Sequence, residues 1–217
     1  MNIFAALFDM DGVIVDSNPY HKISLRDFTL KYGYTLSEED LINKIYGRQN
    51  KEWLPNLFGE LSPEQIRAYA QEKEAHFREI YRPHIKAVAG ITEFIQELHH
   101  RQIPKGIGTS APIENLDFTL EHTGLQEYFD TILTESDIHH GKPNPEIYLK
   151  LAKILNLPPE KCVVFEDSIS GVEAARNAGC KVIGITTTHS PEELGYTDMA
   201  IPHFEALTIE ALASLFD

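Results

Sequence analysis

Two carboxylates, two residues apart, follow the first apolar run of the chain. Residues 3–8 are mostly apolar, and Asp9, Asp11 and Gly12 come directly after them. A short apolar run of this kind is typical of a strand that is buried on both faces of a parallel sheet. Because residues two apart in an extended segment point the same way, both aspartates can act at the carboxyl end of that strand. This edge is where open α/β sheets bind their ligands.

Residues 9–12 alone also suit other interpretations. An aspartate before a glycine is common in solvated turns, and that alternative stays open on these residues alone. An Asp-x-Asp pair also opens calcium-binding loops. Here the fifth loop position would be Val13, and two further apolar residues follow it, so the oxygen ligands are missing. The sequence therefore argues against a calcium loop.

Two later segments carry groups that bind anions. Thr109 and Ser110 lie between a predicted strand and a helix that begins near Pro112. Hydroxyls and free amides at a helix N-terminus form an anion site, although the same residues suit a plain helix cap. Lys142 lies between a glycine and a proline, which indicates a stiff loop; a solvated lysine is the alternative.

A second acidic pair, Glu166 and Asp167, follows the apolar residues 162–165. Together the segments predict one site at the carboxyl edge of the sheet. Asp9 and Asp167 would hold Mg²⁺, which prefers carboxylates, water and phosphate oxygens. Thr109 and Lys142 would hold phosphoryl oxygens, and Asp11 would donate a proton.

The elements that position these residues differ along the chain. Residues 16–86 carry helical patterns and no strand pattern; the clearest start is Ser62, followed by a proline and, three residues on, by Gln65. Beyond residue 87, strands and helices alternate, which is typical of a doubly wound parallel sheet. We expect strands at 104–109, 130–134, 162–165, 181–185 and 198–201, and helices at 91–101, 112–123, 145–156, 169–178 and 205–215.

Composition limits the function classes. The 217 residues are 42% hydrophobic, enough for a sizeable core, and the formal net charge of −14 disfavours nucleic-acid binding. Cys162 and Cys180 lie in apolar surroundings and are expected to be buried structural residues. The sequence has no run of membrane-spanning length and no room for a signal peptide before the first strand, so we expect a cytoplasmic protein with no membrane partner.

Four segments in this order resemble the motifs of the haloacid dehalogenase superfamily. They are residues 9–12, 109–110, 142–143 and 166–168, and residues 166–179 resemble the subgroup of β-phosphoglucomutase and sugar phosphatases. The resemblance covers essentially the whole chain. It implies an α/β fold with a Rossmann-like core of residues 1–15 and 87–217, and an inserted α-helical cap of residues 16–86.

The resemblance also implies roles for the motif residues. Asp9 is the nucleophile that forms an aspartyl-phosphate, and Asp11 protonates the leaving oxygen and then deprotonates the attacking group. Asp9, the carbonyl of Asp11 and Asp167 hold Mg²⁺, and Glu166 supports the metal site. Thr109 and the Ser110 amide bind the transferring group. Lys142 balances the negative charge around Asp9.

The cap decides the substrate, and here the chain departs from the sugar phosphomutases. Asn50 stands where they carry an arginine, and Pro112 where they carry a lysine, although Arg48 or Lys51 could replace the lost cation. His21 keeps a mutase-like feature, and an ordinary packing role within the cap is the alternative. The candidate substrate residues of the cap are His21, Gly47, Arg48 and Asn50.

We therefore expect a monomeric phosphatase that hydrolyses a small phosphorylated metabolite, a sugar phosphate, with Mg²⁺ as its cofactor. A phosphomutase is the alternative. A non-catalytic binding protein with the same fold is a third possibility, but it would not need the four charged motif residues, all of which are present: Asp9, Asp11, Lys142 and Asp167.

Overall fold

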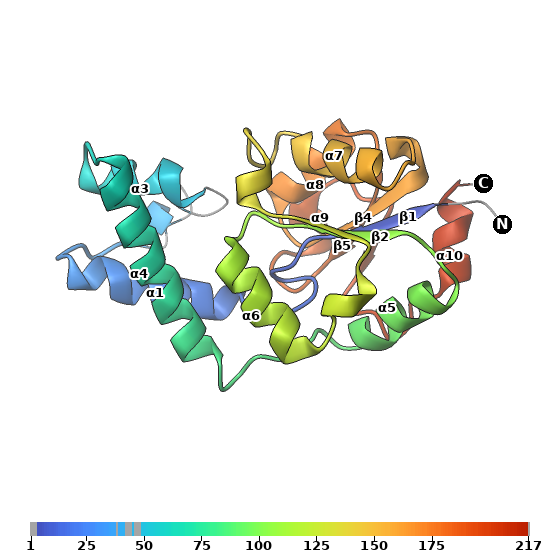
Figure 1. Ribbon diagram of the computed structural model, residues 1–217, viewed down its shortest axis with the longest axis horizontal. Helices are drawn as coiled ribbons and strands as arrows, with labels where there is room; N and C mark the ends of the chain where they lie inside the picture. Colours follow the sequence, from blue (N-terminus) through green and yellow to red (C-terminus); the bar gives the residue numbers. More distant parts are fainter. Residues whose placement is uncertain (1–3, 38, 42–44, 46–48, 217) are drawn as a thin grey trace. The chain divides into compact units, whose positions relative to one another are not determined.

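The chain divides into two compact units in the computed structural model, which describes residues 4–37, 39–41, 45 and 49–216. One unit comprises Met1–Asp16 and Lys86–Asp217, and the other comprises Ser17–Ile85. The first contains a parallel sheet and its helices, and the second is built from helices (Figure 1). No described helix is long and apolar enough to cross a membrane.

The sheet has six strands in the order β3-β2-β1-β4-β5-β6, and every neighbouring pair is parallel. This order places β1 at the centre, and the chain direction across the sheet reverses between β1 and β4. The doubly wound sheet predicted from the alternating pattern is confirmed. The strands are β1 (Ala5–Phe8), β2 (Lys105–Gly108), β3 (Thr131–Leu133), β4 (Cys162–Glu166), β5 (Lys181–Ile185) and β6 (Met199–Ile201).

Helices cover both faces of the sheet. In Figure 1, α7 (Glu146–Ile154) and α8 (Ile169–Asn177) lie on one face, and α5 (Ile91–His100), α6 (Ile113–Thr123) and α10 (Ile209–Ala213) lie on the other. Alternate residues of a strand serve the two faces. On the α7–α8 side, the core includes Leu7, Val164, Tyr148 and Val172. On the other side, Phe8 and Phe165 stack with ring centroids 4.6 Å apart.

The register of β4 and β5 brings the two cysteines together. Val163 pairs with Lys181, so Cys162 and Cys180 lie side by side at the amino ends of these strands. Both thiols are free and buried, as predicted, and they share a hydrogen bond. Their 18-residue separation in sequence gave no sign of this contact.

The helical unit contains α1 (Asn18–Lys31), α3 (Asn50–Phe58) and α4 (Pro63–Tyr81). The predicted start of α4 is confirmed, because the Ser62 hydroxyl accepts a hydrogen bond from the Gln65 backbone N–H, and the Gln65 side-chain oxygen accepts one from the Ser62 backbone N–H. The core of this unit is apolar and includes Leu25, Phe28, Leu41, Ile45, Trp53 and Leu54. The Asp40 backbone N–H donates to the Ser37 hydroxyl in the pattern of a helix cap, and the segment that follows falls partly outside the described residues.

Two helical starts differ from the sequence predictions. The last helix begins at Ile209 rather than near Glu205, because the Thr208 hydroxyl accepts from the Ala211 amide and caps it there. A short helix, α9 (Pro191–Leu194), was not predicted. Its cap, Ser190 with Glu193, carries the same signal as the start of α4, so the pattern was present and was missed.

Candidate active site

The acidic pairs meet at the carboxyl edge of the sheet. Asp9 follows β1, and its backbone N–H donates to the carbonyl of Phe165 on β4, 3.0 Å away. Glu166 ends β4 and Asp167 follows it. One carboxylate oxygen from each of Asp9, Glu166 and Asp167 lies within 4.8 Å of the others. The strand register therefore brings together acids that are about 157 residues apart in the chain.

Lys142 inserts its ammonium between two of these carboxylates. Its Nζ donates to Asp9 Oδ1 and to Glu166 Oε1, both at 2.5 Å. The side chains involved are 5% exposed for Lys142, 10% for Asp9 and 0% for Glu166, so water screens these ion pairs weakly. The solvated lysine that the sequence left open is not what the structure shows.

Burial and like charges change the proton affinities in this cluster. Burial, with a smaller contribution from Glu166 and Asp11, raises the pKa of Asp9 to about 7, although Lys142 opposes the shift. Burial and the charges of Glu166 and Asp9 also raise the pKa of Asp167 well above its usual value. Burial lowers the pKa of Lys142, but the charges of Asp9 and Glu166 outweigh it and raise that pKa. The cluster thus holds more negative charge than Lys142 neutralises.

The cluster fits a hard divalent cation. Mg²⁺ binds carboxylate oxygens and keeps several waters, and it favours sites with a surplus of negative charge. The three clustered carboxylates supply such oxygens. Burial, and after it the charges of the neighbouring carboxylates, raise the pKa of Asp9 and of Asp167, as expected where carboxylates outnumber the cations that pair with them. Glu166 differs from the other two, because its oxygens already accept hydrogen bonds from Lys142, Tyr148 and Ser168.

The remaining core candidates lie at the same edge with fewer contacts to the cluster. Phe8 pairs with Ile107 across β1 and β2, so Asp9 and Thr109 follow neighbouring strands. The buried Thr109 hydroxyl accepts from the Ala111 amide at 3.1 Å, which is a local turn, and Ser110 is exposed. Asp11 is half-buried, and its charge acts on Asp9.

Sequence reasoning missed three residues that hold the cluster. The Thr188 hydroxyl donates to Asp167, and the Thr187 hydroxyl donates to the Gly12 carbonyl at 2.5 Å. These threonines follow β5, so the rule that found the acids, polar residues after a strand, would have found them too. Tyr148 donates to Glu166 from α7, where its spacing indicates an ordinary core residue.

The cap candidates fall into a separate network within the helical unit. The Asn50 amide is engaged on both sides: Oδ1 accepts from Trp53 Nε1 at 3.0 Å, and Nδ2 donates to Glu74 at 2.9 Å. Glu74 also accepts from Lys73 at 2.8 Å. His21 stacks on Phe77 with ring centroids 3.6 Å apart. Gly47 and Arg48 lie outside the described residues.

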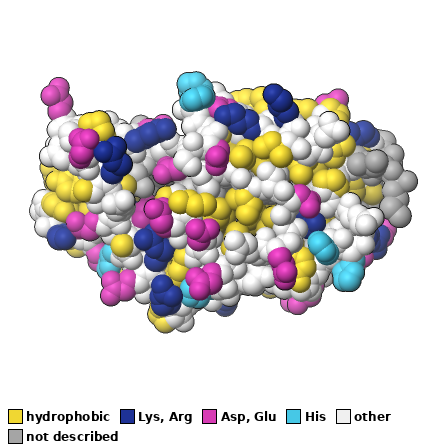
Figure 2. Space-filling model, in the orientation of Figure 1, with side chains coloured by type: hydrophobic (Ala, Val, Ile, Leu, Met, Phe, Trp, Pro, Cys, Tyr) yellow, Lys and Arg dark blue, Asp and Glu magenta, His cyan; other side chains and the backbone are white. Residues whose placement is uncertain are grey.

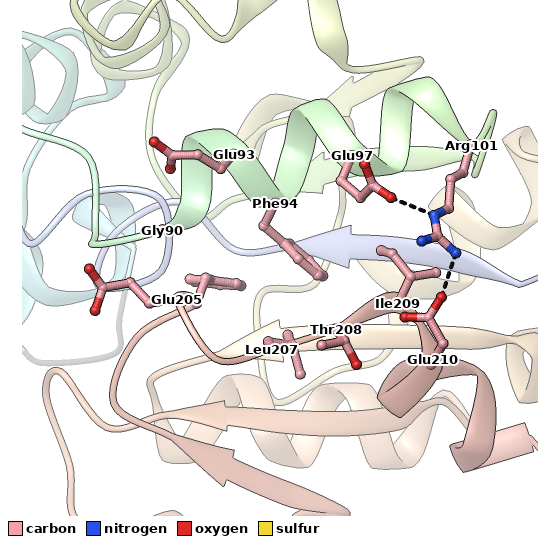
Figure 3. A pocket seen from close by; sticks show the side chains of 11 residues that line it. Gly90, Glu93, Phe94, Glu97, Arg101, Glu205, Leu207, Thr208, Ile209 and Glu210 are labelled. Carbon is pink, nitrogen blue, oxygen red and sulfur yellow. Dashed lines mark hydrogen bonds and ion pairs between the residues drawn. The ribbon is translucent and has the colours of Figure 1, made fainter.

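A cavity of about 460 Å³ elsewhere in the sheet unit is lined by none of these candidates. It lies between α5 and the segment leading into α10 (Figure 3). Arg101 bridges Glu97 at 2.6 Å and Glu210 at 2.7 Å along one side of it.

On the face shown in Figure 2, basic side chains are interspersed with acidic ones rather than gathered in one patch.

Comparison with known proteins identifies the family. Residues 6–185 match the haloacid dehalogenase-like hydrolase family, and the chain belongs to it. A phosphorylated carbohydrates phosphatase from Thermotoga maritima is 34% identical over 82% of this chain and 83% of its own length. The chain spans 57% of the length of a chloroplastic 5-amino-6-(5-phospho-D-ribitylamino)uracil phosphatase from Arabidopsis thaliana, to which it is 27% identical over 98% of its own length.

Solved structures agree with this assignment. A family IA, variant 3 haloacid dehalogenase hydrolase from Entamoeba histolytica is 32% identical, with a TM-score of 0.88 and 99% of both chains covered. A β-phosphoglucomutase from Clostridium difficile is 25% identical, with a TM-score of 0.85, 99% of this chain and 97% of that chain covered. The family resemblance predicted from the four motifs is confirmed.

Proposed function

We propose that this protein is a Mg²⁺-dependent phosphatase that hydrolyses a small phosphorylated metabolite, most favourably a sugar phosphate, through an aspartyl-phosphate on Asp9. The observation that carries the proposal is the Lys142 ammonium between Asp9 and Glu166, beside Asp167, at the carboxyl edge of the sheet. The Thermotoga maritima relative, named as a phosphatase of phosphorylated carbohydrates, supports the substrate class.

The residues divide the work of metal and phosphate binding. Asp9, Asp167 and the Asp11 carbonyl would hold Mg²⁺, and Glu166 would hold Lys142 in place. When bound, the metal neutralises charge on the phosphate so that a carboxylate can approach it. Lys142, the Thr109 hydroxyl and the Ser110 amide would bind the phosphoryl oxygens. Positioning and charge compensation are most of what phosphoryl transfer needs.

The chain's own residues then account for both steps. A carboxylate oxygen of Asp9 attacks phosphorus, the bond to the leaving sugar oxygen breaks, and Asp11 donates a proton to that oxygen. Water next attacks phosphorus and gives a proton to Asp11, and the bond to the Asp9 oxygen breaks to release phosphate. A covalent intermediate divides one difficult displacement into two easier ones.

A phosphate-release screen tests the proposal. Sugar phosphates, nucleotides and pyrophosphate are each incubated with the protein, with Mg²⁺ and with EDTA. We expect release with Mg²⁺ alone, fastest from sugar phosphates. Full activity of the EDTA-treated protein would contradict the proposed metal requirement. Faster release from nucleotides or pyrophosphate would contradict the proposed substrate class.

The monomeric state and the cytoplasmic location stay predictions. Light scattering would test the monomeric state.

A sugar phosphomutase is the second candidate, favoured by the similarity to β-phosphoglucomutase and by His21. A mutase must hold the far phosphate of its substrate so that a sugar hydroxyl reaches the intermediate before water does. The Asn50 amide is committed to Trp53 and Glu74, and Pro112 is no cation. Losing two cationic contacts of ~1.5–3 kcal/mol each costs on the order of a hundredfold or more in discrimination against water.

The two candidates are separated by their products. The protein is given β-glucose 1-phosphate, Mg²⁺ and a trace of the 1,6-bisphosphate, and glucose 6-phosphate and free phosphate are followed separately. We expect free phosphate to lead. If glucose 6-phosphate forms faster than free phosphate, the protein is a phosphomutase and the phosphatase proposal is wrong.

A further inference from the structure

The Tyr148 hydroxyl is buried against the catalytic cluster. Tyr148 lies on α7 and is 0% exposed, and its hydroxyl donates to Glu166 Oε1 at 2.6 Å. The Lys142 ammonium lies 5.2 Å from the centroid of the same ring. One side chain therefore contacts both partners of the ion pair that faces Asp9, once through its hydroxyl and once through its ring.

Hydrogen bonds from four donor groups among the described residues hold the Glu166 carboxylate. Its Oε1 accepts from Lys142 and Tyr148, and its Oε2 accepts from the Ser168 hydroxyl at 3.0 Å and the Ser168 amide at 3.3 Å. Gly171 makes room for the carboxylate, because a Cβ at that position would lie 1.9 Å from the Glu166 carboxyl carbon. These contacts restrict the position of the Glu166 carboxylate. A buried carboxylate whose two oxygens are both hydrogen-bonded can hold a neighbouring side chain in a fixed place.

Glu166 in turn fixes Lys142. The ammonium donates to Glu166 Oε1 and Asp9 Oδ1 at equal distances, so its direction depends on where Oε1 lies. Without the Tyr148 hydroxyl, Lys142 would be the one described residue that still donates a hydrogen bond to Oε1. The carboxylate and the ammonium could then shift together, away from Asp9. Even a small shift of the ammonium would matter, because catalytic groups must be held to within about 0.5 Å of their working positions.

We propose that Tyr148 is a positioning residue for phosphoryl transfer: by fixing Glu166 Oε1 it aims the Lys142 ammonium at Asp9 and at the phosphoryl group. This inference rests on the proposed function and extends it to a fully buried residue that contacts the cluster through Glu166 and Lys142. It also distinguishes the Tyr148 hydroxyl from the Tyr148 ring, since the ring alone would serve for packing in the core of α7 and the sheet.

The test removes the hydroxyl and keeps the ring. Tyr148→Phe is compared with Tyr128→Phe, whose half-buried hydroxyl accepts from Gln96 at 3.3 Å outside the cluster. Phosphate release is measured with the best substrate of the screen. For Tyr148→Phe we expect kcat to fall about tenfold, ~1.4 kcal/mol, with KM changed less than about twofold. Tyr128→Phe should leave both unchanged. A folded Tyr148→Phe with wild-type kcat, or a loss confined to KM, would overturn the proposal.

A double-mutant cycle tests the route through Glu166. If Tyr148 acts through this carboxylate, Tyr148→Phe should lower kcat much less in a Glu166→Gln background than in the wild type, whereas equal losses in both backgrounds would overturn the route. Should Tyr148→Phe not fold, Ser168→Ala reaches the same carboxylate from Oε2. It should lower kcat severalfold at unchanged KM, and wild-type kinetics would count against the proposal. A wild type that releases no phosphate would instead refute the proposed function.

Discussion

Two buried polar clusters, one in each unit, both pair carboxylates with a lysine, but they differ in the number of donors for each carboxylate. In the sheet unit, Asp9, Glu166 and Asp167 gather around the ammonium of Lys142, which is the cation that the described ion pairs bring to them. In the helical unit, Glu74 has Lys73 at 2.8 Å and the Asn50 amide at 2.9 Å. The first cluster has a surplus of carboxylates, whereas the described contacts of Glu74 come from an ammonium and an amide.

The pKa values show what this difference does. Burial raises the pKa of Asp9 to about 7, and the neighbouring carboxylates add to the shift against the pull of Lys142. Burial also acts to raise the pKa of Glu74, but Lys73, His21 and the hydrogen bonds from Asn50 and Lys73 outweigh it, and the result is about 2. Burial alone therefore does not decide whether a carboxylate is stable as an anion. The number of cations and donors per carboxylate does.

The comparison assigns different purposes to the two clusters. A paired buried carboxylate stabilises the fold in its charged form. A surplus of carboxylates destabilises the fold until another cation arrives, which suits a place where a metal and a phosphoryl group bind and leave. Four substitutions test this contrast, in order of decreasing effect.

Asp9→Asn should have the largest effect, a loss of activity without a loss of stability. The amide cannot form the acyl-phosphate, so turnover should fall by on the order of a thousandfold or more, about 4 kcal/mol. Removing one of the crowded carboxylates should leave the melting temperature unchanged or raise it. Kinetics and thermal melts are compared with Asp117→Asn, an exposed carboxylate of α6. Retention of more than about one per cent of turnover, with an unchanged melting curve, would contradict covalent catalysis.

Lys142→Met should lower the free energy of unfolding by about 3 kcal/mol without metal. Removing the ammonium leaves three buried carboxylates with no counter-charge from this residue, and breaking a buried ion pair is costly for that reason. Denaturant unfolding in EDTA measures the loss. The control is Lys150→Met, which removes an exposed ammonium 2.7 Å from Glu146. Equal losses for the two variants would mean that the crowded carboxylates do not need Lys142.

Glu74→Gln should lower stability by about 2–3 kcal/mol at pH 7 and progressively less in acid. The folded-state pKa of Glu74, about 2, lies below its ordinary 4.5. The stabilisation by the charged form is therefore fully present above pH 4.5 and disappears as the pH falls toward 2. Urea unfolding of both proteins across this range measures the difference. A constant difference between pH 7 and pH 2.5 would show that Glu74 contributes by packing rather than by charge.

Lys31→Met should have the smallest effect. Lys31 and Glu72 form an ion pair at 2.7 Å in the same helical unit, with side chains 62% and 36% exposed. Water and salt screen such a pair, so the change in unfolding midpoint should be well below that of Glu74→Gln and should vanish in 1 M salt. A loss as large as that of Glu74→Gln would show that burial is not what separates strong from weak pairs here.

Much of the site followed from local rules. Asp9, Thr109 and Asp167 each follow a buried strand, and the carboxyl ends of parallel strands share an edge, so their convergence was predictable before any coordinates. The start of α4 at Ser62 was predictable because a helix cap depends on four consecutive residues.

Other features depended on packing across the chain. The sequence by itself determined the strand ends, the helix caps and the four charged motif residues, because each depends on neighbours a few residues away. Only the tertiary structure decided that Tyr148 meets Glu166, that Thr188 meets Asp167 and that Cys162 lies beside Cys180. These pairs depend on which helix covers which strand and on strand register. Both are set by the packing of the whole sheet unit, and no local pattern encodes them.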